Sequence, residues 1–178
     1  MRRSRLRSLI FMALCCDLGL FTKKLMGPVA NIITDSLHIP GGITTAFSLM
    51  FLVIAVALMP KFGSGTIMGI VQSGIALSLG MVGSMGMLSP IGYIMPAFMI
   101  DLVFWLGRTV GLKRGYCIIL ANALAGGTAS LTANLIVFRL NGVVLLLYLS
   151  VACTCGVICG CLGESIAARL LPVVAKEK

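Results

Sequence analysis

Two acidic residues lie inside long apolar stretches of the sequence, where a charge is costly. Asp17 and Asp101 both fall near the middle of such a run. Asp101 comes eleven residues after Pro90, which at about 1.5 Å per helical residue puts it roughly 16 Å into an apolar layer about 30 Å thick. Ionisable residues at that depth are usually functional or paired. Asp101 can therefore contact a ligand, or it can be protonated or bonded within the protein; for Asp17 we favour the second interpretation.

The seven cysteines invite a metal or redox interpretation. Cys153, Cys155, Cys159 and Cys161 form a CxC…CxC array. Helical residues two positions apart point about 200° away from each other, so the four sulfurs cannot converge on one ion. Cysteine in apolar runs commonly acts as a small apolar filler. The sequence therefore predicts no metal site, no cofactor and no disulfide.

Catalytic motifs are absent from the sequence. Its one histidine, His38, lies in an irregular stretch, and HExxH, GxxxxGK[ST] and GxSxG do not occur. No two carboxylates lie one helical turn apart, as a general acid and base on one helix would require. We expect no catalytic residue and no enzymatic activity. Any active transport must draw its energy from another subunit or from an ion gradient.

The composition fixes the class of protein that must position these residues. Of 178 residues, 59% are hydrophobic and 11% charged, against about 25% charged in soluble domains. These values exclude a disordered chain, a coiled coil and a disulfide-stapled secreted module. We predict an all-α integral membrane protein with a single transmembrane domain over residues 1–178. It should be a compact bundle of six transmembrane helices, at residues 6–25, 44–59, 65–82, 90–110, 116–138 and 143–171.

The distribution of basic residues predicts the orientation. The net charge is +9, but the basic residues lie mostly between apolar runs, which argues against a nucleic-acid partner. With the N-terminus inside, eleven lysines and arginines lie on the inner side, and only Lys23, Lys24 and Arg139 lie outside. We expect a multi-pass protein of the bacterial cytoplasmic membrane, surrounded by membrane lipid, with both termini inside. The connection 27–42, GPVANIITDSLHIPGG, then becomes a long first extracellular loop.

Small residues recur every fourth position in the fifth predicted helix. One stripe is alanine at 121, 125, 129 and 133, and the next holds Asn122, Gly126, Ser130 and Asn134. Residues four apart share a helix face, and small faces let helices approach closely in lipid. We interpret Asn122 as an interhelical hydrogen-bond partner. Asn134 lies nearer the outer mouth and has two open interpretations, packing or ligand contact.

Three stretches resemble a known family. They are PVANIITDSLHIPGG from Pro28, SLMFLVIAVALMPKFGSGTIMGIVQSGIALSLG from Ser48 and SPIGYIMPAFMIDLVFW from Ser89. They are similar to the S component, the substrate-binding membrane subunit, of an energy-coupling factor (ECF) vitamin importer, in the group of thiamine-precursor and cobalamin-precursor permeases. The last two helices match in character only. The resemblance implies capture of a vitamin or precursor at the outer face, and ATP-driven uptake by a transmembrane energy-coupling subunit and two ATPase subunits.

The resemblance also implies site residues by position. The substrate pocket would draw on Asp35, His38, Gln72, Tyr93, Asp101, Asn134 and Tyr148. Many S components dock on the partner through an AxxxA motif in the first helix. Here Asp17 stands where the second alanine would be, so the expected docking residues are the small residues Cys15, Gly19, Gly65 and Gly69. Acids in the pocket favour a ligand with cationic or hydrogen-donating nitrogens, such as a pyrimidine or benzimidazole.

Two alternatives come from other functional classes. A stand-alone secondary transporter or small channel should show inverted repeats and broken helices, and neither is evident in the sequence. An intramembrane enzyme would need a nucleophile beside a base, and no such pair can be picked out.

Overall fold

The computed structural model describes the backbone of residues 2–37, 43–59, 61–80, 83–140 and 142–175. All the regular structure in these ranges is helical, so the predicted all-α class is confirmed. The elements are α1 (Arg2–Leu37), α2 (Ile43–Leu58), α3 (Ser64–Ser78), the 3₁₀ segment η1 (Gly83–Leu88), α4 (Ser89–Val110), α5 (Arg114–Ala133), the π-helical segment η2 (Asn134–Phe138) and α6 (Val143–Ala175).

Three helical segments are long and apolar enough to cross a membrane. They are Met85–Val110, Arg114–Phe138 and Val143–Leu170, and a shorter apolar helix covers Thr44–Leu58. A membrane protein is thus supported by the length and apolar character of these helices. The six-span arrangement and its orientation stay predictions.

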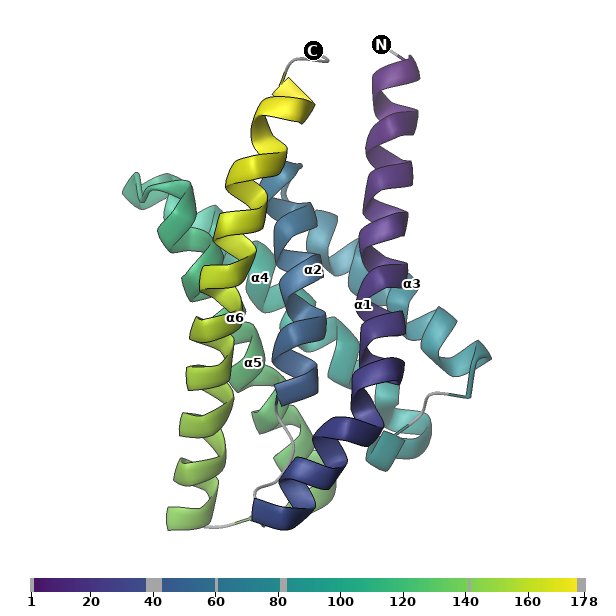
Figure 1. Ribbon diagram of the computed structural model, residues 1–178, viewed down its shortest axis with the longest axis vertical. Helices are drawn as coiled ribbons and strands as arrows, with labels where there is room; N and C mark the ends of the chain where they lie inside the picture. Colours follow the sequence, from purple (N-terminus) through teal and green to yellow (C-terminus); the bar gives the residue numbers. More distant parts are fainter. Residues whose placement is uncertain (1, 38–42, 60, 81–82, 141, 176–178) are drawn as a thin grey trace.

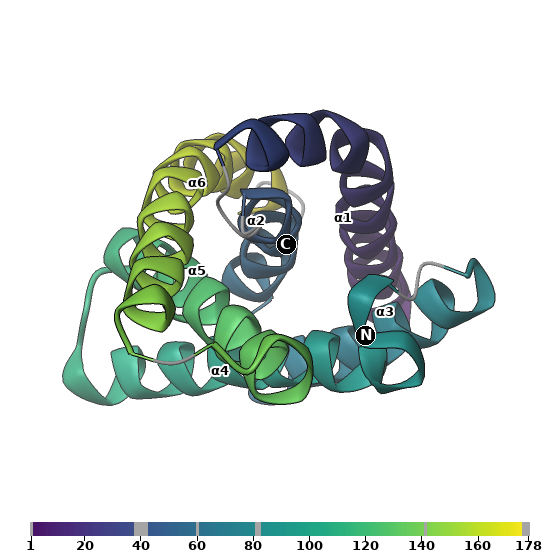
Figure 2. The same cartoon turned by 90° about the horizontal axis from the view of Figure 1, so that it is seen from below.

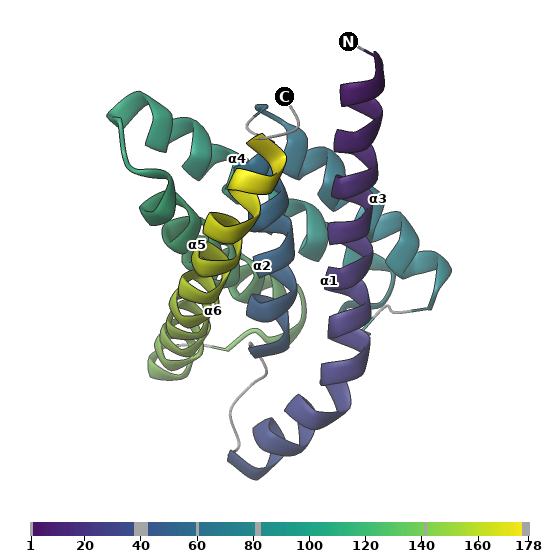
Figure 3. The same cartoon turned by 45° about the horizontal axis from the view of Figure 1, so that its top comes forward.

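The central element is α2, which packs against all five other α-helices. Viewed along the bundle, α2 lies inside a ring formed by the other helices (Figure 2). Its residues from Leu52 to Ala57 are all buried. α1 and α6 lie on opposite sides of α2, and α1 begins at the end of the molecule where α6 finishes (Figures 1 and 3). An apolar helix without a polar face is expected at such a buried position.

The prediction of a long first extracellular loop over residues 27–42 is wrong for most of that stretch. α1 continues through Gly27 and Pro28 to Leu37. A glycine followed by a proline is a turn signal in sequence, but a proline inside a helix can also produce a bend. The last part of α1 indeed turns sideways under the bundle (Figure 1). Asp35 therefore lies on a helix and its side chain is not described, and His38 lies outside the described residues.

Glycines of α6 cross closely over α5, the helix for which the spacing of small residues predicted close packing. A Cβ atom at Gly156 would lie 2.7 Å from the Cα of Ala123 and 2.8 Å from the carbonyl oxygen of Asn122. A Cβ atom at Gly160 would lie 2.8 Å from the Cα of Ile119. Real Cβ atoms do not approach backbone so closely, so the two helices can adopt this distance only because these positions are glycine.

Candidate functional site

Asp101 caps the N-terminus of α3 from the neighbouring helix α4. Its side chain is 3% exposed. Oδ1 accepts a hydrogen bond from the backbone N–H of Gly65 at 2.9 Å, and Oδ2 accepts bonds from the backbone N–H and the hydroxyl of Thr66, both at 2.7 Å. The first N–H groups of a helix have no partner within it, and the helix dipole favours a negative charge there. These bonds give the Asp101 carboxylate its partners inside the protein. They agree with the second interpretation from the sequence, in which Asp101 is bonded within the protein and does not contact a ligand.

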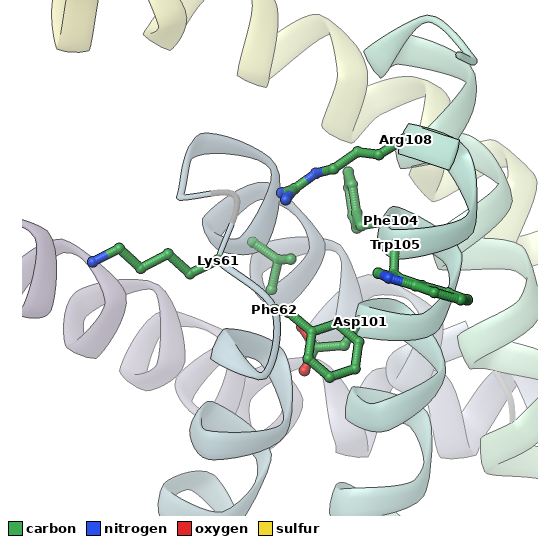
Figure 4. A pocket seen from close by; sticks show the side chains of 7 residues that line it. Lys61, Phe62, Asp101, Phe104, Trp105 and Arg108 are labelled. Carbon is green, nitrogen blue, oxygen red and sulfur yellow. The ribbon is translucent and has the colours of Figure 1, made fainter. Parts of the chain in front are cut away.

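A small hollow next to Asp101 does not have the size of a ligand pocket. Its volume is about 10 Å³, which is near the space for one water molecule, whereas small-molecule sites measure roughly 300–1,000 Å³. The side chain of Arg108 reaches from α4 toward the connection between α2 and α3 (Figure 4). The side chain of Lys61 points in the other direction, away from Arg108 and Asp101 (Figure 4). The hollow is lined by Val56, Lys61, Phe62, Asp101, Phe104, Trp105 and Arg108.

A second polar site joins α1 to α4 at Lys23. The ammonium of Lys23 donates a hydrogen bond to the hydroxyl oxygen of Tyr93 at 3.2 Å, and it lies 4.5 Å from the centroid of the same ring. Both side chains are partly buried. A cation over an aromatic ring is attracted by the electrons of the ring face. Among the residues that the structure describes, no carboxylate forms an ion pair with Lys23.

Gln72 of α3 lies beside the same stretch of α1. Its side chain is 4% exposed, and its Nε2 lies 3.4 Å from the position that a Cβ atom would take at Gly19. Gly19 and Lys23 are one helical turn apart and share a face of α1. Ser48 of α2 donates a hydrogen bond to the carbonyl oxygen of Gly19 at 2.9 Å. We call Lys23, Gln72 and Tyr93 the Lys23 cluster.

The Lys23 cluster contains two of the predicted pocket residues, Gln72 and Tyr93, and one residue that the sequence analysis did not select. Lys23 was counted there only as an outer charge. The position of Lys23, four residues after Gly19 in the first predicted helix, is a signal that could have identified it. Residues four apart share a helix face, so Lys23 lies on the face where Gly19 packs against other helices.

Asn134 begins η2, directly after α5, and Tyr148 is the sixth residue of α6. The Asn134 side chain accepts a hydrogen bond from the Leu140 N–H at 2.7 Å and donates one to the Leu140 carbonyl at 3.3 Å. Tyr148 is 4% exposed, and its ring meets the ring of Phe138 edge to face at 6.1 Å. The amide of Asn134 therefore closes its own turn, and it shares no bonding partner with Asp101.

The four expected docking residues lie within contacts of the chain itself. A Cβ atom at Gly69 would lie 2.5 Å from the Cβ of Ala97, and one at Gly19 would lie 3.1 Å from the carbonyl oxygen of Ser48. Gly65 faces Asp101, and Cys15 is 7% exposed. In this structure these small residues let the helices of the protein pack on one another, so they are not exposed contacts for a partner. The apolar side chains exposed on α1 beside them are Leu14, Leu18, Phe21 and Leu25.

Asn122 forms interhelical hydrogen bonds, as the sequence suggested, and it links three helices. It is fully buried, and its Nδ2 donates hydrogen bonds to the carbonyl oxygens of Gly156 on α6 at 2.9 Å and of Ala46 on α2 at 3.4 Å. Its Oδ1 has no hydrogen-bond partner among the described residues. Buried amides of this kind join helices in membranes, so the position of Asn122 agrees with packing.

No protein-family model matches the chain, and neither a curated protein nor a solved structure matches it.

Proposed function

We propose that this protein is the substrate-binding S component of an ECF-type vitamin importer. It would capture a vitamin or vitamin precursor at the outer face of the bacterial membrane and deliver it through a transmembrane energy-coupling subunit and two ATPase subunits. The resemblance of the first four helices suggests this function. The lack of a phosphate-binding GxxxxGK[ST] motif in the sequence agrees with energy supplied by a partner.

The observation that carries the proposal is the Lys23 cluster. In the predicted orientation it lies near the outer end of the bundle, because Tyr93 is only one helical turn into α4. Polar and ionisable groups within membrane helices are expensive and mark substrate pathways. An ammonium, an amide and a phenol can fix the orientation of a small polar ligand by hydrogen bonds. These are binding groups, which favours a binding subunit over an enzyme.

The proposed contact with the energy-coupling subunit lies on the outer face of α1. The exposed residues there recur at helical spacing and form one apolar stripe, and the stripe consists of Leu14, Leu18, Phe21 and Leu25. Such a stripe can pack against a transmembrane partner as well as against lipid. Replacing the small seam residues would disturb the fold of this chain, whereas replacing residues of the stripe would affect only a partner.

Reconstitution tests the function directly. The protein is placed in lipid vesicles with an energy-coupling subunit and its ATPase pair, and uptake of a radiolabelled mixture of water-soluble vitamins is measured with and without ATP. We expect uptake of one compound that requires both ATP and this chain. Uptake by this chain alone, driven by an ion gradient, would show a secondary transporter instead. A control with a Walker-motif variant of the ATPase separates ATP binding from ATP hydrolysis.

A further inference from the structure

We propose that the ligand carries an anionic group, a carboxylate or a phosphate, and that Lys23 binds this group together with Gln72. The inference rests on the proposed function and adds the chemical class of its ligand. It reverses the expectation from the sequence, which favoured cationic nitrogens because acids were assigned to the pocket. The acid that carried that expectation, Asp101, is 3% exposed and bonded to the start of α3.

Among the side chains that the structure describes, no carboxylate forms an ion pair with Lys23. Its described hydrogen-bond partner is the neutral phenol of Tyr93. Asp17 is exposed and lies six residues earlier on α1, which turns it to a different face. Asp35 lies twelve residues further along α1, beyond Pro28, and its side chain is not described. A partly buried ammonium without a counter-charge is costly, and an anionic ligand would remove that cost.

Glu164, the remaining described acid, belongs to another part of the molecule. Its carboxylate lies beside Gly115, at the start of α5, where a Cβ atom would be 3.0 Å from Oε1. Two of the three ammonium protons of Lys23 remain for a ligand after the bond to Tyr93. Lys23 can therefore still donate to a ligand while it is bonded to Tyr93.

Gln72 supplies the neutral donor that anion recognition needs. Its side chain is 4% exposed, and Gly19 leaves the space beside Nε2 without a side chain. An ammonium combined with an amide N–H binds carboxylate and phosphate oxygens by charge-assisted hydrogen bonds. The hydroxyl and the ring of Tyr93 both contact the ammonium, so the cation is positioned before the ligand arrives.

The test uses matched acid and neutral compounds as probes. Detergent-purified protein is mixed with nicotinate and nicotinamide, pantothenate and pantothenol, and thiamine monophosphate and thiamine, and the retained compound is identified by native mass spectrometry. We expect retention of an acid and not of its neutral or less anionic counterpart. Lys23→Met should weaken binding of that acid by about ten- to a hundred-fold, which is the loss of one charge-assisted hydrogen bond.

Two variants control for folding and for general charge. Lys24 is exposed on the next position of α1, so Lys24→Met removes the same charge without touching the cluster and should bind as the unmodified protein does. Lys23→Arg keeps a cation and should retain most of the affinity, which a merely structural role for the Lys23–Tyr93 contact would not predict. Thermal unfolding of each variant checks that it is folded.

The outcomes separate this inference from the proposed function. Retention of a neutral or cationic probe, with affinity unchanged in Lys23→Met, overturns the anionic ligand and leaves the vitamin-binding function supported. Retention of a phospholipid that is lost only in Lys23→Met overturns the inference too, because the phosphate would then belong to a lipid. Retention of no probe by the unmodified protein overturns the anionic ligand, and the reconstitution experiment decides the proposed function independently.

Discussion

The carboxylate of Asp101 on α4 holds Thr66 on α3 by two hydrogen bonds, with Oδ2 lying 2.7 Å from both the backbone nitrogen and the hydroxyl oxygen of that threonine. One acid thus performs on a neighbouring helix the task that a capping residue normally performs on its own helix, where Gly63 has no side chain to offer. The arrangement fixes the start of α3 against α4 and explains how a carboxylate can be buried between these two helices.

We expect Asp101→Ala to destabilise the protein strongly. The change leaves the N–H groups of Gly65 and Thr66 without partners in a buried place, and each unsatisfied donor costs about 1–3 kcal/mol. The free energy of unfolding should fall by roughly 2–5 kcal/mol, measured by denaturant or SDS titration in mixed micelles. Full stability together with lost ligand binding would instead return Asp101 to the substrate pocket.

Thr66→Val is the matched control for this prediction. It removes the hydroxyl bond to Asp101 and keeps both the side-chain volume and the backbone N–H. The loss should be about 1 kcal/mol, as for a single hydrogen bond, and smaller than that of Asp101→Ala. If the two variants lose the same free energy of unfolding, the bonds from the Asp101 carboxylate to the backbone N–H groups of α3 contribute nothing to stability.

A second prediction concerns the contact between α3 and α4. A Cβ atom at Gly69 would lie 2.5 Å from the Cβ of Ala97 and 3.1 Å from the carbonyl oxygen of Tyr93. We expect Gly69→Ala to force the helices apart and to lower stability by roughly 1–3 kcal/mol. Unfolding temperature in detergent is the measurement. Preserved stability combined with lost binding of a coupling subunit would restore Gly69 as a docking residue.

Gly74→Ala provides the control on the same helix. Gly74 is exposed, and no atom lies within 4 Å of the position that its Cβ would take. Replacing glycine by alanine inside a helix stabilises it by roughly 0.5–1 kcal/mol when nothing clashes. The two substitutions on α3 should therefore change stability in opposite directions.

Hydrophobic run length was sufficient to predict most helices but not the end of the first. α2 and α4 begin and end within one residue of the ranges predicted from the apolar runs. α1 runs on to Leu37 because Pro28 is accommodated inside the helix. Glycine and proline signal a break in local structure, whereas packing decides whether a proline ends a helix or bends it. No local pattern contains that information.

The hydrogen-bond partners of the candidate site residues are harder to predict from the sequence than the ends of the helices. Depth along α4 predicted that Asp101 lies well inside an apolar layer, but nothing in the sequence indicates that the start of α3 lies within reach of its oxygens. The same holds for Lys23 and Tyr93, which are 70 positions apart in the chain. Composition and periodicity report which face of a helix is buried, and only the arrangement of helices determines which polar groups meet there.

The orientation is tested by labelling introduced cysteines in a background without the native seven. The charge asymmetry of the sequence places Ser4 inside and His38 outside. In intact cells, a membrane-impermeant maleimide should label His38→Cys and leave Ser4→Cys unlabelled until the membrane is opened. The reverse pattern would invert the topology, and with it the assignment of the Lys23 cluster to the outer side.

The last prediction separates a structural from a functional role for Asn122. Its Nδ2 binds carbonyl oxygens of α2 and α6, while Oδ1 has no partner among the described residues. Carbonyl oxygens within helices already accept backbone bonds, so removing Asn122 leaves no unsatisfied group behind. Asn122→Leu exchanges interhelical hydrogen bonds worth about 0.6–1.7 kcal/mol for apolar contact of similar volume. It should therefore change stability by less than about 1 kcal/mol.

Asn122→Ala removes the same hydrogen bonds and also leaves a void at the contact of α2, α5 and α6. Because packing in lipid depends on close contact, we expect this variant to be less stable than Asn122→Leu by about 1 kcal/mol or more. Both variants should retain ligand binding if Asn122 only joins helices. Binding that disappears in Asn122→Leu while stability is preserved would show that the unbonded Oδ1 serves the ligand, and that the pocket extends from the Lys23 cluster into the centre of the bundle.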